Sequence, residues 1–143
     1  MYEHDAQLLA PVRANLYKHQ SEAFLFVLNL YGALDGTPPE SNGAGLLFEM
    51  GCGKTITSIA IAGFMYQMGL VKRLLIVAPL SVLSVWQEEF ARFASFPFSL
   101  TVLSGPVQRK KQLLRTVTTD RLDIKVINYE SAWRLKTELL AYN

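Results

Sequence analysis

The chain has 143 residues, of which 50% are hydrophobic and 18% charged, and its formal net charge is +2. This balance excludes an intrinsically disordered chain and indicates a globular protein with a buried core. The longest apolar stretch, residues 74–86, is interrupted by a proline and two serines, whereas a membrane span needs about 20 apolar residues. Because no apolar segment follows a basic start, no signal peptide is predicted. We expect a cytoplasmic protein encoded by a bacterium or phage, or a nuclear one if the source is eukaryotic.

The few cysteines and histidines and the distribution of charge limit the possible ligands. Cys52 is the only cysteine and the two histidines are not spaced as a metal pair, so we expect neither a disulfide nor a structural metal. Residues 1–72 carry four basic and six acidic groups, a net charge of −2. Residues 73–143 carry ten and six, a net charge of +4, which is compatible with a polyanionic partner.

Strands and helices are predicted to alternate along most of the chain. Residues 16–31 have apolar side chains at helical spacing, with the amide of Gln20 on the same face, and a Gly- and Pro-rich loop follows over 32–45. Short apolar strands are expected over 46–48, 74–78, 100–103 and 124–128, and helices over 54–68, 82–93, 106–117 and 131–141. Four successive βα units predict an open, mostly parallel α/β sheet with helices on both faces.

The segment Gly51-Cys52-Gly53-Lys54-Thr55, between a predicted strand and a predicted helix, has the composition of a phosphate-binding loop. Glycines let backbone N–H groups approach phosphate oxygens closely, and the N-terminus of a helix favours anions. The Lys54 ammonium can reach the β and γ phosphates, and the Thr55 hydroxyl can bind Mg²⁺. The full pattern has a glycine six residues before the lysine, where Phe48 stands here.

Four stretches, taken in order, resemble the Swi/Snf-type branch of the superfamily-two helicases and translocases. They are residues 16–20, residues 46–55, residues 75–90, and residues 101–105 with Arg109 followed by 123–130. The resemblance covers nearly the whole chain and implies a three-layer RecA-like P-loop fold. Residues 1–143 would then form the N-terminal part of its first lobe, with the adenine-recognition segment and a helix in 1–31 and the P-loop βα units in 45–143.

The resemblance also implies cofactors and site residues. The cofactors would be ATP and Mg²⁺, with Lys54 and Thr55 as catalytic residues and Thr55 as the metal ligand. Gln20 would select adenine, and the nucleotide phosphates would lie against Met50, Gly51, Cys52, Gly53, Lys54 and Thr55. The backbone of DNA would contact residues at the ends of strands, namely Pro79, Ser81, Ser104, Gly105 and Tyr129. We interpret Trp86 as a core residue, and Arg109, Lys110, Lys111 and Arg115 as a solvated helix face.

Parts of the family pattern are absent from the sequence. The acidic box that holds magnesium and the second RecA-like lobe would follow residue 143, so we expect this chain alone to bind ATP, hydrolyse it poorly and bind DNA weakly. The strand at 46–48 would also lack its usual neighbours. Three outcomes are then open: the sheet closes in another strand order, a second chain pairs with the exposed edge, or the P-loop region is poorly ordered. We expect one of the first two.

Two other functions remain open from the residues alone. One is a stand-alone, non-catalytic nucleotide-binding P-loop module. The other is a small-molecule P-loop kinase, although such enzymes usually keep the first glycine and carry an arginine-rich lid. The favoured interpretation is the ATP-binding portion of an ATP-dependent DNA helicase or translocase.

Overall fold

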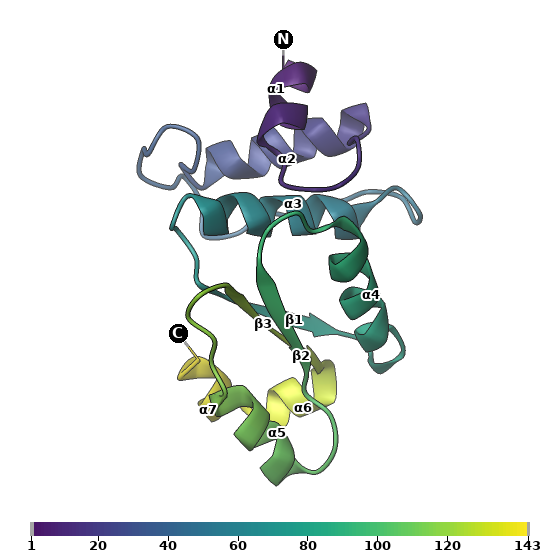
Figure 1. Ribbon diagram of the computed structural model, residues 1–143, viewed down its shortest axis with the longest axis vertical. Helices are drawn as coiled ribbons and strands as arrows, with labels where there is room; N and C mark the ends of the chain where they lie inside the picture. The colour runs from purple at the N-terminus through teal and green to yellow at the C-terminus, as the bar shows by residue number, and fades with distance from the viewer. Residues whose placement is uncertain (1, 143) are drawn as a thin grey trace. The chain divides into compact units, whose positions relative to one another are not determined.

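The computed structural model describes residues 2–142 and divides into two compact units (Figure 1). The helical unit comprises residues 1–71 and 89–96, and the sheet unit comprises residues 72–88 and 97–143. Each unit has its own hydrophobic core. Among the described residues, no helix is long and apolar enough to cross a membrane.

The helical unit is built from α1 (Tyr2–Leu9), α2 (Lys18–Leu30) and α3 (Lys54–Gln67). Helices α2 and α3 lie where the apolar spacing predicted them, within two residues at each end. Their apolar faces pack together, and the rings of Phe24 and Phe64 meet edge to face with centroids 6.0 Å apart. The core of this unit therefore joins the helix of the expected adenine segment to the helix that follows the glycine turn.

Helix α1 was not predicted, because its short sequence has little apolar periodicity. The side chain of Gln7 explains how it is attached to the unit. Its Nε2 donates to the carbonyl of Leu16 at 2.7 Å, and its Oε1 accepts from the Leu16 N–H at 3.2 Å. A side-chain amide thus satisfies both backbone groups of Leu16, two residues before α2, as a neighbouring peptide would.

The sheet unit contains a parallel three-stranded sheet in the order β1-β3-β2, which confirms the predicted parallel α/β arrangement. The strands are β1 (Arg73–Ala78), β2 (Phe98–Val102) and β3 (Leu122–Asn128). The remaining elements are η1 (Leu80–Val82), α4 (Leu83–Phe93, which continues into the helical unit), α5 (Val107–Arg115), α6 (Tyr129–Arg134) and α7 (Lys136–Leu140). The central strand β3 is buried along most of its length, as an apolar parallel strand should be.

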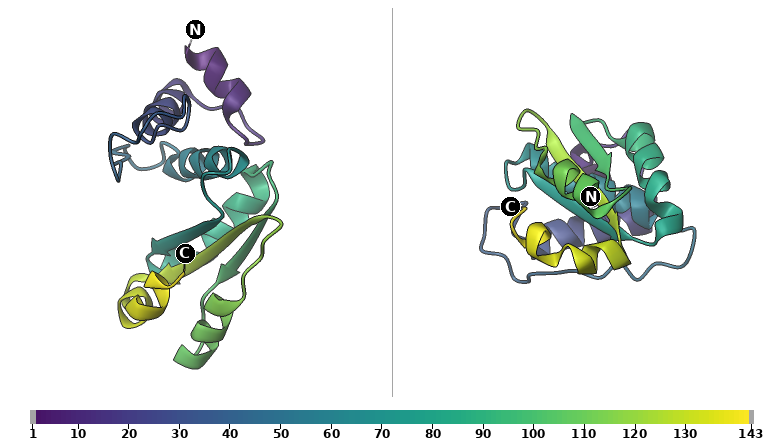
Figure 2. Two further views of the ribbon diagram at one scale, coloured as in Figure 1. Left: turned by 90° about the vertical axis from the view of Figure 1, so that its left-hand side faces the viewer. Right: turned by 90° about the horizontal axis from the view of Figure 1, so that it is seen from below.

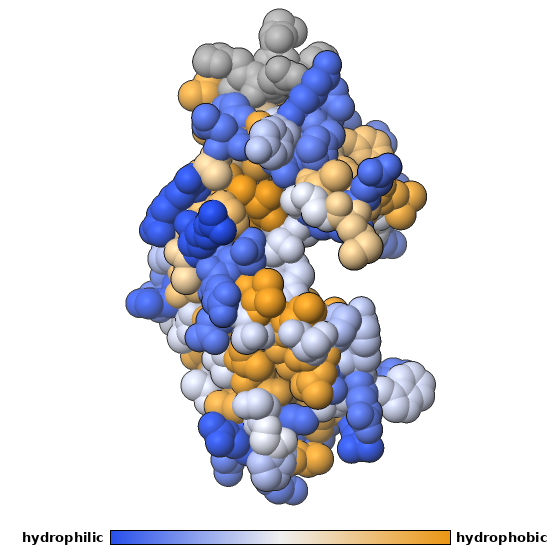
Figure 3. Space-filling view, turned by 90° about the vertical axis from the view of Figure 1, so that its right-hand side faces the viewer, coloured by the Kyte–Doolittle hydropathy of each residue, from blue (hydrophilic) through white to orange (hydrophobic). Residues whose placement is uncertain are grey.

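The core of the sheet unit forms where helices cover one face of the sheet (Figure 2). Leu75 and Ile127 point to this face, and they pack with Leu103, Leu114 and Leu135. Ile76, Ile124 and Val126 occupy alternate strand positions and are buried on the other face. Apolar side chains still reach the surface of this unit, as Figure 3 shows, and the exposed ones include Val77 and Leu80.

Two predicted elements are wrong. Residues 46–48 form no strand, and within the described chain the sheet has only β1, β2 and β3, so it does not close in another order around this segment. A three-residue strand is stable only when a partner pairs with its backbone, and no described strand does so. The predicted helix over 131–141 is interrupted at Leu135, whose φ of −101° and ψ of 21° separate α6 from α7.

Candidate functional site

The backbone of the glycine turn needs glycine at two positions. Gly51 and Gly53 have φ angles of +79° and +82°, a region that favours glycine. Gly53 is the N-cap of α3, and no described side chain caps this helix end. The N–H groups of the first residues of α3 therefore lack both an intrahelical acceptor and a side-chain acceptor. Lys54 is exposed and Thr55 half-buried in this first turn, so both are placed beside the unpaired donors.

The carbonyl groups of Cys52 and Gly53 accept hydrogen bonds from residues of α2 and α3. The Cys52 carbonyl accepts hydrogen bonds from His19 Nε2 at 2.8 Å and from Gln20 Nε2 at 3.1 Å. The Gly53 carbonyl accepts from Thr57, through its N–H at 3.2 Å and its Oγ1 at 2.9 Å. The turn is thus fixed to α2 on one side and to α3 on the other.

Gln20 is buried between α2 and the turn, with 4% of its surface exposed. Besides its bond to Cys52, its Oε1 accepts from the N–H of Tyr17 at 2.9 Å. A carboxamide can make four hydrogen bonds, so one N–H and one lone pair of Gln20 have no hydrogen-bond partner among the described residues. The structure brings Gln20 to the glycine turn, while its contact with adenine stays a prediction.

His19 and Phe48 belong to the same site, although sequence reasoning gave His19 no role and noted Phe48 only as the residue at the position of the first glycine. The His19 ring meets the edge of Phe48 at a centroid distance of 5.3 Å and stacks on Tyr17 at 6.1 Å. His19 and Cys52 are 33 positions apart, so no periodic pattern could reveal the contact. Phe48, at the position of the missing first glycine, supports the histidine.

The other two residues expected beside the phosphates contribute less to the structure of the turn. Met50 is 97% exposed, and its side chain lies outside the core. Cys52 is half-buried and has a free thiol, and its role in the turn is carried by its backbone carbonyl.

The residues expected to contact DNA all lie in the sheet unit, after the carboxyl ends of its strands. Pro79 follows β1, Ser104 and Gly105 follow β2, and Tyr129 follows β3. The register pairs Ala78 with Asn128, so the carboxyl ends of the strands lie together along one border of the sheet, which we call the carboxyl edge. Open α/β sheets bind ligands at this border. All of these residues and Ser81 are exposed.

The cationic helix face expected on α5 is only partly solvated. Lys110 Nζ donates to Ser131 Oγ at 2.6 Å, and Lys111 forms an ion pair with Glu138 at 2.7 Å. The ammonium of Lys111 keeps the pKa of Glu138 below its usual value. The side chain of Arg109 instead lies against Gly105, since a Cβ added to Gly105 would be 3.0 Å from the Cδ of Arg109. Arg109 is therefore close to the residues expected to contact DNA.

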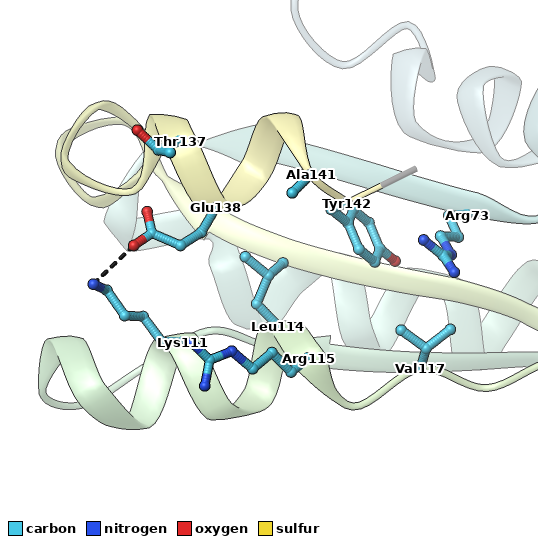
Figure 4. Close-up of a pocket in the computed structure, with 9 residues that line it drawn as sticks. All are labelled: Arg73, Lys111, Leu114, Arg115, Val117, Thr137, Glu138, Ala141 and Tyr142. Atoms are coloured by element: carbon cyan, nitrogen blue, oxygen red, sulfur yellow. Dashed lines mark ion pairs between the residues drawn. The ribbon is translucent and has the colours of Figure 1, made fainter.

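A cavity of about 430 Å³ lies between α5, α7 and the start of β1 (Figure 4). Its polar lining includes Arg73, Arg115 and the ion pair of Lys111 with Glu138, and the ring of Tyr142 faces Arg73. Because Arg73 begins β1, the cavity lies at the amino ends of the strands and is separate from the carboxyl edge.

Comparisons with known proteins agree with these features. The chain is similar to Helicase SWR1 of Saccharomyces cerevisiae, with 31% identity over 127 residues that cover 88% of this chain and 8% of that protein. It is also similar to Switch 2 of Arabidopsis thaliana, with 28% identity over 134 residues, 85% of this chain and 14% of that protein. These eukaryotic relatives give no support to the expected bacterial or phage origin.

A solved structure has the same fold. The Sulfolobus solfataricus SWI2/SNF2 ATPase core in complex with dsDNA matches with a TM-score of 0.67 and 26% sequence identity, over 88% of this chain and 24% of that chain. This match confirms the predicted RecA-like α/β fold, although the chain spans only a small part of each relative's length. The model of the SNF2-related domain family matches residues 10–143. The chain therefore belongs to the SNF2-related domain family.

Proposed function

We propose that this chain is the ATP-binding portion of an ATP-dependent DNA translocase. The observation that carries the proposal is the glycine turn at the start of α3. Its Cys52 and Gly53 carbonyls accept hydrogen bonds from α2 and α3, and no described side chain caps the N-terminus of α3. A triphosphate needs several hydrogen-bond donors at close range. Unpaired backbone N–H groups at the N-terminus of a helix supply such donors.

In this proposal the turn residues have distinct roles. Lys54 places its ammonium against the β and γ phosphates, and the residues from Met50 to Gly53 follow the phosphate chain with their backbone. Mg²⁺ bound to the phosphates would neutralise part of their charge. The Thr55 hydroxyl would supply one ligand to it, since Mg²⁺ usually keeps several waters when it binds nucleotides.

The DNA side of the proposal rests on the carboxyl edge of the sheet unit. Ser81, Ser104, Gly105 and Tyr129 expose hydroxyl and backbone groups there, and Pro79 lies among them. Such groups contact phosphates and position a protein on DNA without reading its sequence. The similarity to an ATPase core solved with dsDNA supports this assignment.

The test is ATP-dependent thermal stabilisation of the chain and of its Lys54→Ala variant. At an ATP concentration of about 100 times Kd, the wild type should gain about 2.7 kcal/mol, and Lys54→Ala should gain almost nothing. Lys72→Ala removes an exposed lysine outside the turn and should behave like the wild type. Equal stabilisation of the Lys54 variant would show that the turn does not bind the phosphates. ATP binding without any DNA binding would favour a stand-alone nucleotide-binding module.

A further inference from the structure

We infer that His19 is a positioning residue of the phosphate turn. Together with Gln20 it holds the Cys52 carbonyl oxygen so that the Gly53 N–H points toward the bound anion. The inference rests on the proposed nucleotide site and adds to it a residue that acts through the backbone and not by touching the nucleotide.

The geometry of the peptide bond links the two groups. In a trans peptide the C=O of one residue and the N–H of the next point in opposite directions, and the chain has no cis peptide among its described residues. Two donors on α2 hold the Cys52 carbonyl, so the Gly53 N–H must point away from α2. Thr57 holds the Gly53 carbonyl in the same way, which turns the Lys54 N–H outward as well.

The hydrogen bond defines the state of the histidine. A carbonyl oxygen carries no hydrogen, so Nε2 of His19 must be the protonated ring nitrogen. Phe48 meets the ring at an interplanar angle of 83°, and Tyr17 stacks on it at 15°, so two aromatic side chains limit its rotation. The donor is therefore oriented before any ligand arrives.

The contact requires a very close approach of α2 to the turn. A Cβ on Gly53 would lie 2.0 Å from Gln20 Nε2, so only glycine leaves room for the two donors. His19 itself is exposed, and an exposed hydrogen bond contributes little net stability because water replaces it when it is lost. The effect of His19 should consequently appear in the affinity for phosphates and not in the stability of the fold.

The first experiment compares the dissociation constants of ATP, ADP and adenosine for His19→Ala, His19→Gln and Lys18→Ala. His19→Ala should weaken ATP and ADP about fivefold, as expected for one misdirected donor, and leave adenosine unchanged. His19→Gln, whose amide can donate, should recover ATP affinity to within about twofold of the wild type. Lys18→Ala, an adjacent exposed change, should have no effect. Equal losses for adenosine and ATP, or no loss for ATP, would overturn the inference.

A second measurement reads the restraint directly in the 16.0 kDa chain by NMR. His19→Ala should move the resonances of the Cys52 carbonyl carbon and the Gly53 amide, and Lys18→Ala should leave both in place. Unchanged resonances in His19→Ala would refute the inference even if the affinities changed. If the wild type binds ATP through Lys54 but His19→Ala binds it equally well, only the role of His19 fails. If the wild type binds no ATP, both the proposed function and this inference are wrong.

Discussion

The hydroxyl of Tyr142 lies 3.0 Å from Oδ2 of Asp123 and 3.0 Å from the Asp123 carbonyl oxygen. The Asp123 carboxylate is completely buried and also accepts from Lys125 Nζ at 3.1 Å, and Lys125 donates in addition to the Thr116 carbonyl. Buried charges are tolerated when they are paired and hydrogen-bonded in this way. The network attaches Tyr142, two residues after the end of α7, to the start of the central strand.

The pKa of Tyr142 makes this attachment testable by pH. Burial, with the neighbouring Asp123 charge as the second cause, raises the pKa of its hydroxyl well above the usual value of 10.0. Because the pKa of the Tyr142 hydroxyl is higher in the folded than in the unfolded chain, this hydroxyl stabilises the fold fully below the unfolded pKa of about 10. The stabilisation by Tyr142 is lost as the pH rises through the pKa of the folded state. At neutral pH, Tyr142→Phe should lower the free energy of unfolding by about 1–3 kcal/mol.

The measurement is urea denaturation of the wild type and Tyr142→Phe from pH 7 to 11. The difference between the two should be constant up to about pH 10 and then shrink, since the phenylalanine variant has no hydroxyl to ionise. The lysines titrate in both proteins, so their effect cancels in the difference between the two unfolding free energies. Parallel curves over the whole range would contradict the role of the hydroxyl.

The two turn glycines should respond differently to alanine. Both have positive φ, which costs alanine about 1–2 kcal/mol, but a Cβ on Gly51 meets nothing within 4 Å while one on Gly53 overlaps the Gln20 amide. Gly53→Ala should therefore lose about 1–3 kcal/mol more than Gly51→Ala, together with ATP binding. Equal losses of stability in the two variants, measured by chemical denaturation, would show that α2 does not lie against the turn in solution.

Gln20→Ala tests whether this amide selects adenine. If the remaining N–H and lone pair of Gln20 bind adenine, as predicted, the variant should lose more affinity for ATP than for GTP. Both affinities should fall to some extent because the bond to the Cys52 carbonyl is also lost. The measurement is the ratio of the two dissociation constants by calorimetry. An unchanged ratio would leave Gln20 as a purely structural amide.

Binding to duplex DNA should be weak, unselective and strongly dependent on salt. Arg109→Ala should reduce the slope of log K against log salt by about one, as expected for the loss of one phosphate contact. Arg121→Ala is the matched control, because Arg121 precedes β3 at the opposite end of the sheet and is paired with Asp120. Tight, sequence-specific binding at physiological salt would contradict the proposal and point to a dedicated recognition module.

Local features of the sequence determined most of the secondary structure and the place of the glycine turn. Helix α3 and the three observed strands are rich in apolar residues and are bounded by glycine, proline or polar residues. Such patterns depend only on neighbours along the chain. The positive φ angles of Gly51 and Gly53 follow from the same local chemistry, because few other residues adopt that backbone.

Contacts between distant segments were decided by the tertiary structure alone. Residues 46–48 have the composition of a strand but form none, since a strand exists only where a partner pairs with its backbone. The charges of Asp123 and Lys125 are buried because the strand order places β3 in the centre of the sheet. His19 reaches Cys52 only after α2 and α3 pack together, so its part in the turn arises from the fold and not from any spacing in the sequence.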